Sequence, residues 1–127
     1  MKIENIKFKA KELGTGKWKV GFLQRDMDYN LCILIANKED HSWYWTQIDP
    51  STVCMFTGLK DCEGKEIWEG DILEGESKSE VVYTKGTFTI SFIGYNKRVF
   101  SYPLCYYIKE DGTVDGKVIG NKFDKEK

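Results

Sequence analysis

The chain has 127 residues, of which 41% are hydrophobic, 14% aromatic and 31% charged, and its formal net charge at pH 7 is −1. A chain of this length buries roughly two thirds of the surface that its unfolded form exposes, so we expect a hydrophobic core in one domain or two small lobes. No apolar run approaches the roughly 20 residues that a membrane helix requires, and the first ten residues alternate charged with apolar side chains, unlike a secretory signal. We therefore predict a cytoplasmic protein with no membrane partner.

The cysteines and the single histidine argue against a metal site. Cys32, Cys54, Cys62 and Cys105 form no C-x-x-C pair, and His41 is the only histidine, so the usual zinc spacings are absent. We predict no metal ion and no cofactor. Without a secretory signal the thiols are expected to be free and buried or half-buried, and the cysteine at position 62, in a predicted turn, is expected to be the most exposed.

Charge is distributed unevenly along the chain. Residues 1 to 25 carry seven Lys or Arg against two Glu, residues 26 to 80 carry four against thirteen acids, and residues 81 to 127 carry eight against five. The net charges of the three segments are therefore +5, −9 and +3. Such blocks are compatible with a basic face for nucleic acid or with charge complementarity between segments or subunits. We favour the second, because sustained DNA binding normally goes with a net basic domain.

Alternation with a period of two dominates the first half of the chain. Ile6, Phe8 and Ala10 alternate with lysines, which predicts a half-buried strand with a lysine-rich outer face. Residues 18 to 22 repeat the pattern, and the Gly-Thr-Gly sequence at 14 to 16 predicts a turn, so the two runs are expected to form a hairpin. An apolar run at 31 to 35 and alternation at 43 to 46 predict two further strands.

The residue pattern of the second half of the chain predicts further strands and little helix. Strands are expected at 81 to 83, 87 to 92 and 118 to 120, with turns at the Asp-Gly pairs 111 to 112 and 115 to 116. One helical turn is predicted at 49 to 52, where Asp49 can cap and Pro50 suits the first helical position. A second helical segment is predicted from Ser101 to Ile108, with Ser101 as its cap.

The stretch FTGLKDCEGKEIWEGDIL, residues 56 to 73, is rich in acids and glycines, yet its spacing predicts turns. Asp61 can accept backbone N–H groups and Gly64 can take the left-handed conformation after a type I turn, which makes a hairpin of the flanking apolar residues. Gly70 permits a second reversal, Asp71 can bond nearby backbone, and a new strand follows. This arrangement recurs in SH3-like small barrels.

The same stretch resembles the signature of the YopX family, small proteins of phages and prophages of Gram-positive and other bacteria. IKFKAKELGTGKWKVGFL resembles the family's amino-terminal hairpin, IDPSTV its lead-in to the signature and VIGNKF its carboxyl-terminal segment, so the likeness runs from about residue 6 to residue 123. The matching positions are Thr57, Gly58, Leu59, Asp61, Gly64, Lys65, Ile67, Glu69, Gly70, Asp71, Ile72, Ile119, Gly120 and Asn121. The chain departs from the pattern at 54 to 55, 62 and 122 to 123, so no polar role is expected at those places.

The resemblance implies mostly β structure, a barrel-like carboxyl-terminal part and self-association, and it implies no particular activity. With the strand pattern, it leads us to predict an all-β protein with at most one or two short helices. Residues 1 to 55 are expected to form an amino-terminal β-hairpin region and residues 56 to 127 an SH3-like small β-barrel, either as two lobes or as one compact unit. Structural roles are predicted for Gly58, Asp61, Gly64, Gly70, Asp71, Gly120 and Asn121.

Three functional classes remain open, and we favour a non-enzymatic interaction or self-assembling accessory protein. Its partner would be other copies of the chain, or a host or phage protein in the bacterial cytoplasm. The candidate surface is Trp43, Tyr44 and Trp45, because adjacent strand residues point to opposite faces and at least one of these aromatics should lie outside the core. The alternative is a sheet that is covered on both faces.

The second class is a nucleic-acid-binding module, since small β-barrels can stack bases on aromatic side chains and follow the backbone with lysines. The candidates beside Trp18 are Lys7, Lys9, Lys11, Lys17 and Lys19. The alternative interpretation is a solvated strand face whose lysines discourage edge pairing.

The third class is an enzyme, for which two acidic pairs are the visible material: Glu63 with Glu66, and Glu69 with Asp71. Carboxylates can hold Mg²⁺ or serve as acid and base. The sequence offers them no histidine partner, no phosphate-binding glycine loop and no G-x-S-x-G motif, and His41 lies in a polar turn. We therefore predict that the protein is not an enzyme and has no catalytic residues.

Overall fold

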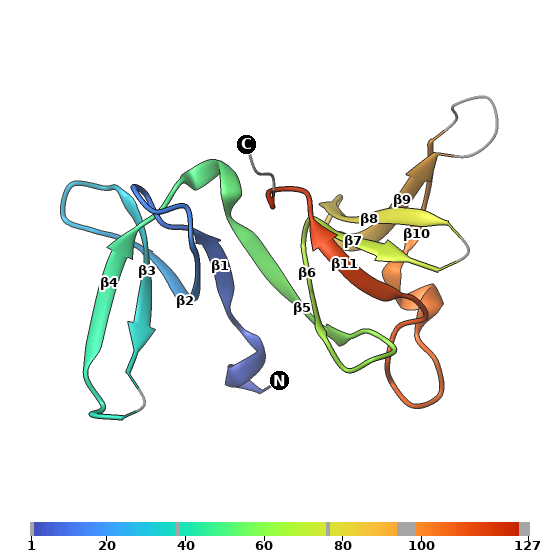
Figure 1. Ribbon diagram of the computed structural model, residues 1–127, viewed down its shortest axis with the longest axis horizontal. Coiled ribbons are helices and arrows are strands. Elements are labelled where there is room, and N and C mark those ends of the chain that lie inside the picture. Colours follow the sequence, from blue (N-terminus) through green and yellow to red (C-terminus); the bar gives the residue numbers. More distant parts are fainter. Residues whose placement is uncertain (1, 38, 76, 94–98, 125–127) are drawn as a thin grey trace. The chain divides into compact units, whose positions relative to one another are not determined.

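The computed structural model describes residues 2–37, 39–75, 77–93 and 99–124 of the chain. These residues form antiparallel strands and single 3-10 turns, which confirms the predicted all-β class (Figure 1). The chain divides into two compact units, Met1–Phe56 and Thr57–Lys127, and the predicted boundary lay between residues 55 and 56. Within the described residues, no helix has the length and apolar character that crossing a membrane would require.

The first unit is a meander of antiparallel strands. Its elements are η1 (Ile3–Asn5), β1 (Phe8–Lys11), β2 (Trp18–Arg25), β3 (Leu31–Ala36), β4 (Trp43–Gln47), η2 (Pro50–Thr52) and the start of β5 (Cys54–Lys60). The strand order is β4-β3-β2-β1, with the first residues of β5 paired to β1. The predicted hairpin of β1 and β2 and the cap of η2 are confirmed, because the Asp49 carboxylate accepts the N–H of Ser51 at 3.0 Å.

One face of the first sheet carries its core. Ala10, Ile33 and Ile48 are almost fully buried, and they pack with apolar residues from the same face of the neighbouring strands, among them Phe8 and Leu23. Gly21 lies on this face where β2 meets β3. A Cβ built at Gly21 would be 2.1 Å from the backbone oxygen of residue 34, so no larger residue fits there without a backbone shift.

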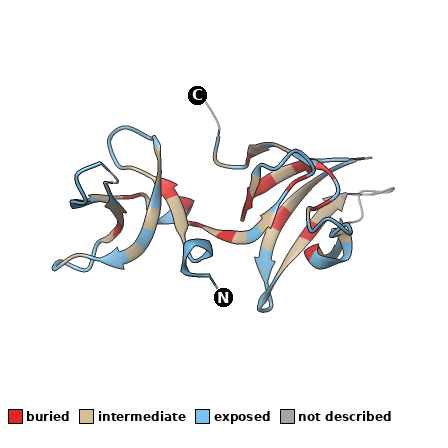
Figure 2. Cartoon of the chain, turned by 90° about the horizontal axis from the view of Figure 1, so that it is seen from below, coloured by how far each residue is buried: buried red, intermediate tan, exposed pale blue. Residues whose placement is uncertain are grey.

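The second unit contains the later part of β5 and six further strands. Its elements are β6 (Glu66–Trp68), β7 (Asp71–Glu74), β8 (Lys78–Thr84), β9 (Thr87–Ile93), β10 (Val99–Pro103), η4 (Leu104–Tyr107) and β11 (Lys117–Asn121). β5 continues against β6, and the other five strands form a sheet in the order β10-β9-β8-β7-β11. Its core consists of Ile67, Leu73, Val81, Ile90, Leu104 and Val114. In each unit the buried residues lie mainly within strands and the turns are exposed (Figure 2).

The predicted helix from Ser101 to Ile108 is wrong in its first half. Ser101 lies opposite Ser91 in the β9–β10 ladder, and the helical turn is confined to η4, with Pro103 as its cap residue. Proline disfavours helical geometry in the residue before it, so Tyr102 stays extended and a helix cannot pass through it. The segment that was predicted as helix therefore contributes the outer strand of the sheet.

The five-stranded sheet is open. Strands β10 and β11 form its two edges, and no ladder joins them among the described residues. The SH3-like form of the second unit therefore stays a prediction. Cys32 and Cys54 are buried, Cys62 and Cys105 are exposed, and no disulfide joins any of these four described cysteines. The exposure of Cys105 differs from the prediction that this thiol is buried or half-buried.

Candidate binding surface

The register of the first sheet places lysines and aromatic residues on the same face. Lys9 lies opposite Val20, and Lys11 lies opposite Trp18. Residues that face each other across an antiparallel pair project from the same side of the sheet, so these lysines share a face with Trp18 and, two residues after Val20, with Phe22. This face is the reverse of the one that carries the core. The lysine-rich and aromatic rows therefore form one surface.

The same surface continues across β3 and β4. Phe22 lies opposite Leu34, which in turn lies opposite Trp45, and Trp43 lies opposite Ala36. Because Ala36 is small, the ring of Trp43 reaches over it to Phe22, with ring centroids 6.3 Å apart. We call the surface formed by Val20, Phe22, Leu34, Trp43 and Trp45 the aromatic face.

Large apolar side chains of the aromatic face are exposed. Trp43 is 56% exposed, Trp45 54%, Val20 43% and Phe22 42%. Single exposed apolar residues are ordinary, whereas neighbouring ones on one face of a sheet form a candidate interaction surface. Of the three aromatics singled out in the sequence, Tyr44 lies opposite Ile35 and so projects from the other face, where it is 47% exposed.

The predicted lysine candidates are only partly brought together. The ammonium group of Lys9 lies 4.5 Å from the ring centroid of Trp18, and that of Lys11 lies 5.5 Å from it. Lys7 contacts a different ring, that of Phe56, at 4.7 Å. Lys19 pairs with Ala10 and therefore projects from the core side of the sheet. The structure thus joins two lysines with one tryptophan at the end of the aromatic face.

A hollow of about 480 Å³ lies at the β2–β3 turn, next to Trp45; it is lined by Gln24, Arg25, Asp26, Met27, Asp28 and Trp45. Asp26 organises the turn, because one carboxylate oxygen accepts two backbone N–H groups and the other accepts the side-chain amide of Gln47 at 3.1 Å. The hydrogen bond from Gln47 is the largest influence that lowers the pKa of Asp26. Met27, which is 98% exposed, and Trp45 supply the apolar side chains of the lining, and the other lining residues are polar or charged.

The acidic stretch of the second unit is built into turns. Asp61 is 1% exposed, and its carboxylate accepts the N–H groups of Glu63, Lys65 and Val118, each at 2.8 Å. Burial tends to raise the pKa of Asp61, but the three backbone N–H donors outweigh it and hold this pKa below its usual value. The bond to Val118 ties the β5–β6 turn to β11, so Asp61 joins segments that are distant in the sequence.

A second buried carboxylate makes a similar connection. Asp71 accepts the N–H of Trp68 at 2.8 Å and the side-chain amide of Asn121 at 2.9 Å. The same amide donates to the backbone oxygen of Glu69 at 3.1 Å, and the side-chain oxygen of Asn121 accepts the N–H of Phe123 at 3.0 Å. We call Asp61, Asp71 and Asn121 the polar clamp, because they bind the turns after β5 and β6 to β11.

The other residues for which a structural role was predicted are glycines in the turns and strands. Gly64 and Gly70 have φ angles of +85° and +86°, the region that the turn pattern predicts for glycine. Gly58 lies within β5 and also has a positive φ, whereas Gly120 follows an irregularity in the β7–β11 register. Among the described residues, no group of three or more His, Cys, Asp or Glu is arranged to hold a metal ion.

The sequence pattern of the whole chain can be compared with known families. The family model described as YopX protein matches residues 8–126. The chain belongs to the YopX family. No curated protein matches the chain. The YopX match begins at the first residue of β1 and extends past β11, so it includes both the aromatic face and the polar clamp.

Sequence reasoning missed several residues of this surface. Val20, Phe22 and Leu34 were expected to be ordinary strand residues, and nothing in their local pattern distinguishes them from core positions. The signal that could have found them is the length of the turn between β1 and β2, because this length fixes the register and hence the face on which each row projects.

Proposed function

We propose that this YopX-family protein is a non-enzymatic accessory protein of a phage or prophage, acting in the bacterial cytoplasm by binding other copies of itself through the aromatic face. The observation that carries the proposal is the exposure of Phe22, Trp43 and Trp45 side by side on one sheet face. Aromatic side chains are enriched at protein interfaces, and tryptophan is enriched among the residues that dominate binding energy. The SH3-like form of the second unit is part of this proposal.

The edge strand β4 supports a second copy as the partner. β4 is the outer strand of the first sheet, and its sequence WYWTQ has no lysine, no proline and no charge to discourage pairing. Two copies of such a strand can lie antiparallel about a twofold axis, which brings identical uncharged side chains together without electrostatic cost. The pairing would place Trp43 and Trp45 of the two subunits beside each other on one continuous sheet face.

A non-enzymatic role is supported by the roles of the acids. Asp61 and Asp71 use both of their carboxylate oxygens in hydrogen bonds that hold turns to β11. A general acid or base must exchange protons with a substrate and a metal ligand must offer a lone pair, so carboxylates committed to structural bonds are poor candidates for either task.

The proposal is tested by light scattering after size exclusion, over a range of protein concentrations. We expect a mass that is a multiple of 14.7 kDa for the wild type and the mass of one chain for the double variant Trp43→Ser, Trp45→Ser. Tyr106→Ser is the matched control, because Tyr106 is 73% exposed in η4 of the other unit and should leave the mass unchanged. A single-chain mass for the wild type at every concentration contradicts the proposal.

A nucleic-acid partner is the alternative, and the contacts of Lys9 and Lys11 with Trp18 favour it, because lysines beside an exposed aromatic row can follow a backbone while bases stack. Fluorescence anisotropy with a labelled thymidine oligonucleotide tests this alternative. Binding that weakens steeply between about 50 and 200 mM salt, and that Lys11→Gln and Trp45→Ser both reduce, would replace self-association as the function of the face.

A further inference from the structure

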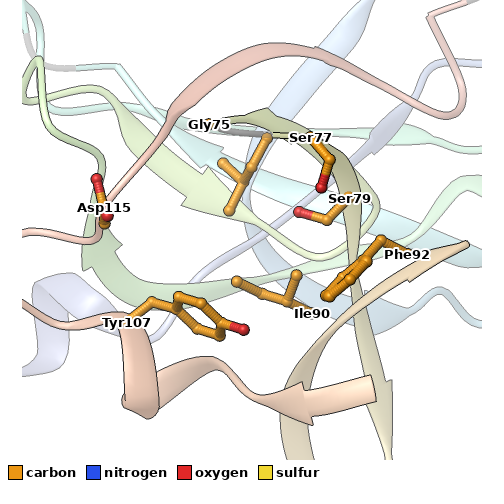
Figure 3. A pocket seen from close by; sticks show the side chains of 8 residues that line it. Gly75, Ser77, Ser79, Ile90, Phe92, Tyr107 and Asp115 are labelled. Carbon is orange, nitrogen blue, oxygen red and sulfur yellow. The ribbon is translucent and has the colours of Figure 1, made fainter. Parts of the chain in front are cut away.

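A separate pocket of about 370 Å³ lies in the second unit (Figure 3). It is lined by Leu73, Gly75, Ser77, Ser79, Ile90, Phe92, Tyr107 and Asp115. These residues come from β7, the β7–β8 turn, β8, β9, η4 and the segment before β11. The volume is within the range of about 300 to 1,000 Å³ that small-molecule sites occupy.

The pocket exists because small residues stand where a core would have large ones. Ser79 lies opposite Leu73 in the β7–β8 ladder, and Leu73 is a buried core residue, so Ser79 projects from the core face of the sheet. Ser77, two residues earlier, and Gly75 are also small. Protein interiors are otherwise packed to the density of organic crystals, so small side chains at the end of a core leave open space.

The lining combines an apolar floor with converging polar groups. Ile90 and Phe92 form the floor, and the hydroxyl groups of Ser77, Ser79 and Tyr107 are directed into the space above them (Figure 3). Asp115 stands on the opposite side and is the charged residue among the described lining residues. Its backbone N–H donates to the carbonyl of Tyr107 at 2.9 Å, so these two walls are held together.

We propose that this pocket binds a small ammonium compound with an apolar or aromatic body. The body would lie on Ile90 and Phe92, while the ammonium group would pair with the Asp115 carboxylate on the opposite side of the pocket. Aromatic rings attract cations to their faces, and Phe92 and Tyr107 provide two rings in the lining. A carboxylate at the rim favours a cation over an anion of the same shape, because the charge of the ligand decides the sign of the interaction. The inference is independent of the function proposed for the first unit.

The test uses two probes of similar shape and opposite charge, phenethylamine and 3-phenylpropionate, with NMR titration of the backbone amides. We expect phenethylamine to shift the signals of pocket residues saturably and 3-phenylpropionate to bind about fivefold more weakly, the upper end of what one exposed charge pair supplies. Asp115→Asn should weaken phenethylamine by about the same factor. Glu110→Gln is the control, since Glu110 is an exposed acid of the preceding loop that does not line the pocket.

A filling variant shows whether binding occurs in the pocket itself. Ser79→Leu places an apolar side chain in the open volume and should abolish binding of phenethylamine. Equal affinity for the two probes, no saturable shift with phenethylamine, or unchanged affinity in Asp115→Asn would each overturn the proposal. Because Asp115 is exposed, Asp115→Asn is expected to fold and decides the question even where Ser79→Leu does not fold. None of these measurements depends on the oligomeric mass, so the two proposals fail separately.

Discussion

The two units of the chain use their polar and apolar residues in opposite ways. The first unit has a small core on one face and exposes Phe22, Trp43 and Trp45 on the other. The second unit buries Asp61, Asp71 and Asn121 within hydrogen bonds to its own turns. The positions that resemble the family signature lie mostly in the second unit, whereas the candidate binding surface lies in the first. The signature positions therefore determine how the second unit folds, whereas Trp43 and Trp45 of the candidate surface lie outside the stretches that resemble the family.

The largest expected effect comes from removing the buried carboxylate of the clamp. Asp61→Ala leaves the N–H groups of Glu63, Lys65 and Val118 without their acceptor, and a buried unsatisfied donor costs about 1 to 3 kcal/mol. We expect a loss of about 3 kcal/mol in the free energy of unfolding, measured by urea denaturation. Trp45→Ser is the matched variant of the first unit, and an equal loss there would remove the contrast between the units.

A steric change in the first unit should come next. Gly21→Ala introduces a Cβ at 2.1 Å from a backbone oxygen of β3, and relief requires the two strands to separate. Overpacking of this kind costs about 1 to 3 kcal/mol, and we expect about 2 kcal/mol by urea denaturation. Gly21 lies on the core face of the sheet, so a loss of stability in this variant would show that packing on the core face stabilises the first unit. A neutral result would mean that β2 and β3 are not closely packed at Gly21.

Two turn glycines of the second unit are expected to differ in how much their substitution lowers stability. Gly70→Ala and Gly64→Ala both put a side chain at a positive φ, which costs about 1 kcal/mol. At Gly70 the new Cβ would also lie 3.2 Å from the side-chain nitrogen of Asn121, whereas nothing lies within 4 Å at Gly64. We expect Gly70→Ala to lower the melting temperature more than Gly64→Ala. The reverse order would argue against the tight contact of Asn121 with the turn.

The Asp61 carboxylate of the polar clamp should make the free energy of unfolding depend on pH. The folded-state pKa of Asp61 lies below its unfolded value, so the carboxylate stabilises the fold above the unfolded pKa, and this contribution is lost as the pH falls through the folded pKa. The stability difference between the wild type and Asp61→Asn should be largest near neutral pH and should shrink below about pH 4. A difference that stays constant down to pH 2 would show that the charge of Asp61 does not matter. Denaturation at stepped pH values measures it.

The smallest effect on stability is expected on the aromatic face. Trp43→Ser removes a side chain that is 56% exposed, so little buried apolar area is lost. We expect a change in the free energy of unfolding within about 0.5 kcal/mol at concentrations where the protein is monomeric, as is usual for surface positions. A larger loss would indicate that Trp43 belongs to the fold rather than to a binding surface.

Local features could be predicted from the sequence, and long-range ones could not. The alternation around Phe8 and Ala10 and the turn residues Gly64 and Gly70 act within a few positions of themselves, so the strands and turns were predicted there. The bond between Asp71 and Asn121 joins residues 50 positions apart, and the pocket draws on several separate elements. The outer strand β10 was missed because Ser101 suits the cap position of a helix, and only the pairing with the distant strand β9 shows that it belongs to a sheet.

Because the buried and the exposed cysteines lie in different units, thiol modification can measure how often the first unit opens. Cys32 and Cys54 are buried in its sheet, whereas the two exposed thiols, Cys62 and Cys105, belong to the second unit. A maleimide reagent should therefore modify the second unit at once, and the buried pair only when the first sheet opens. Once the exposed pair is blocked, the slow modification rate reports the opening free energy of the first unit in the native protein, without any substitution. A partner that covers the aromatic face should slow that rate.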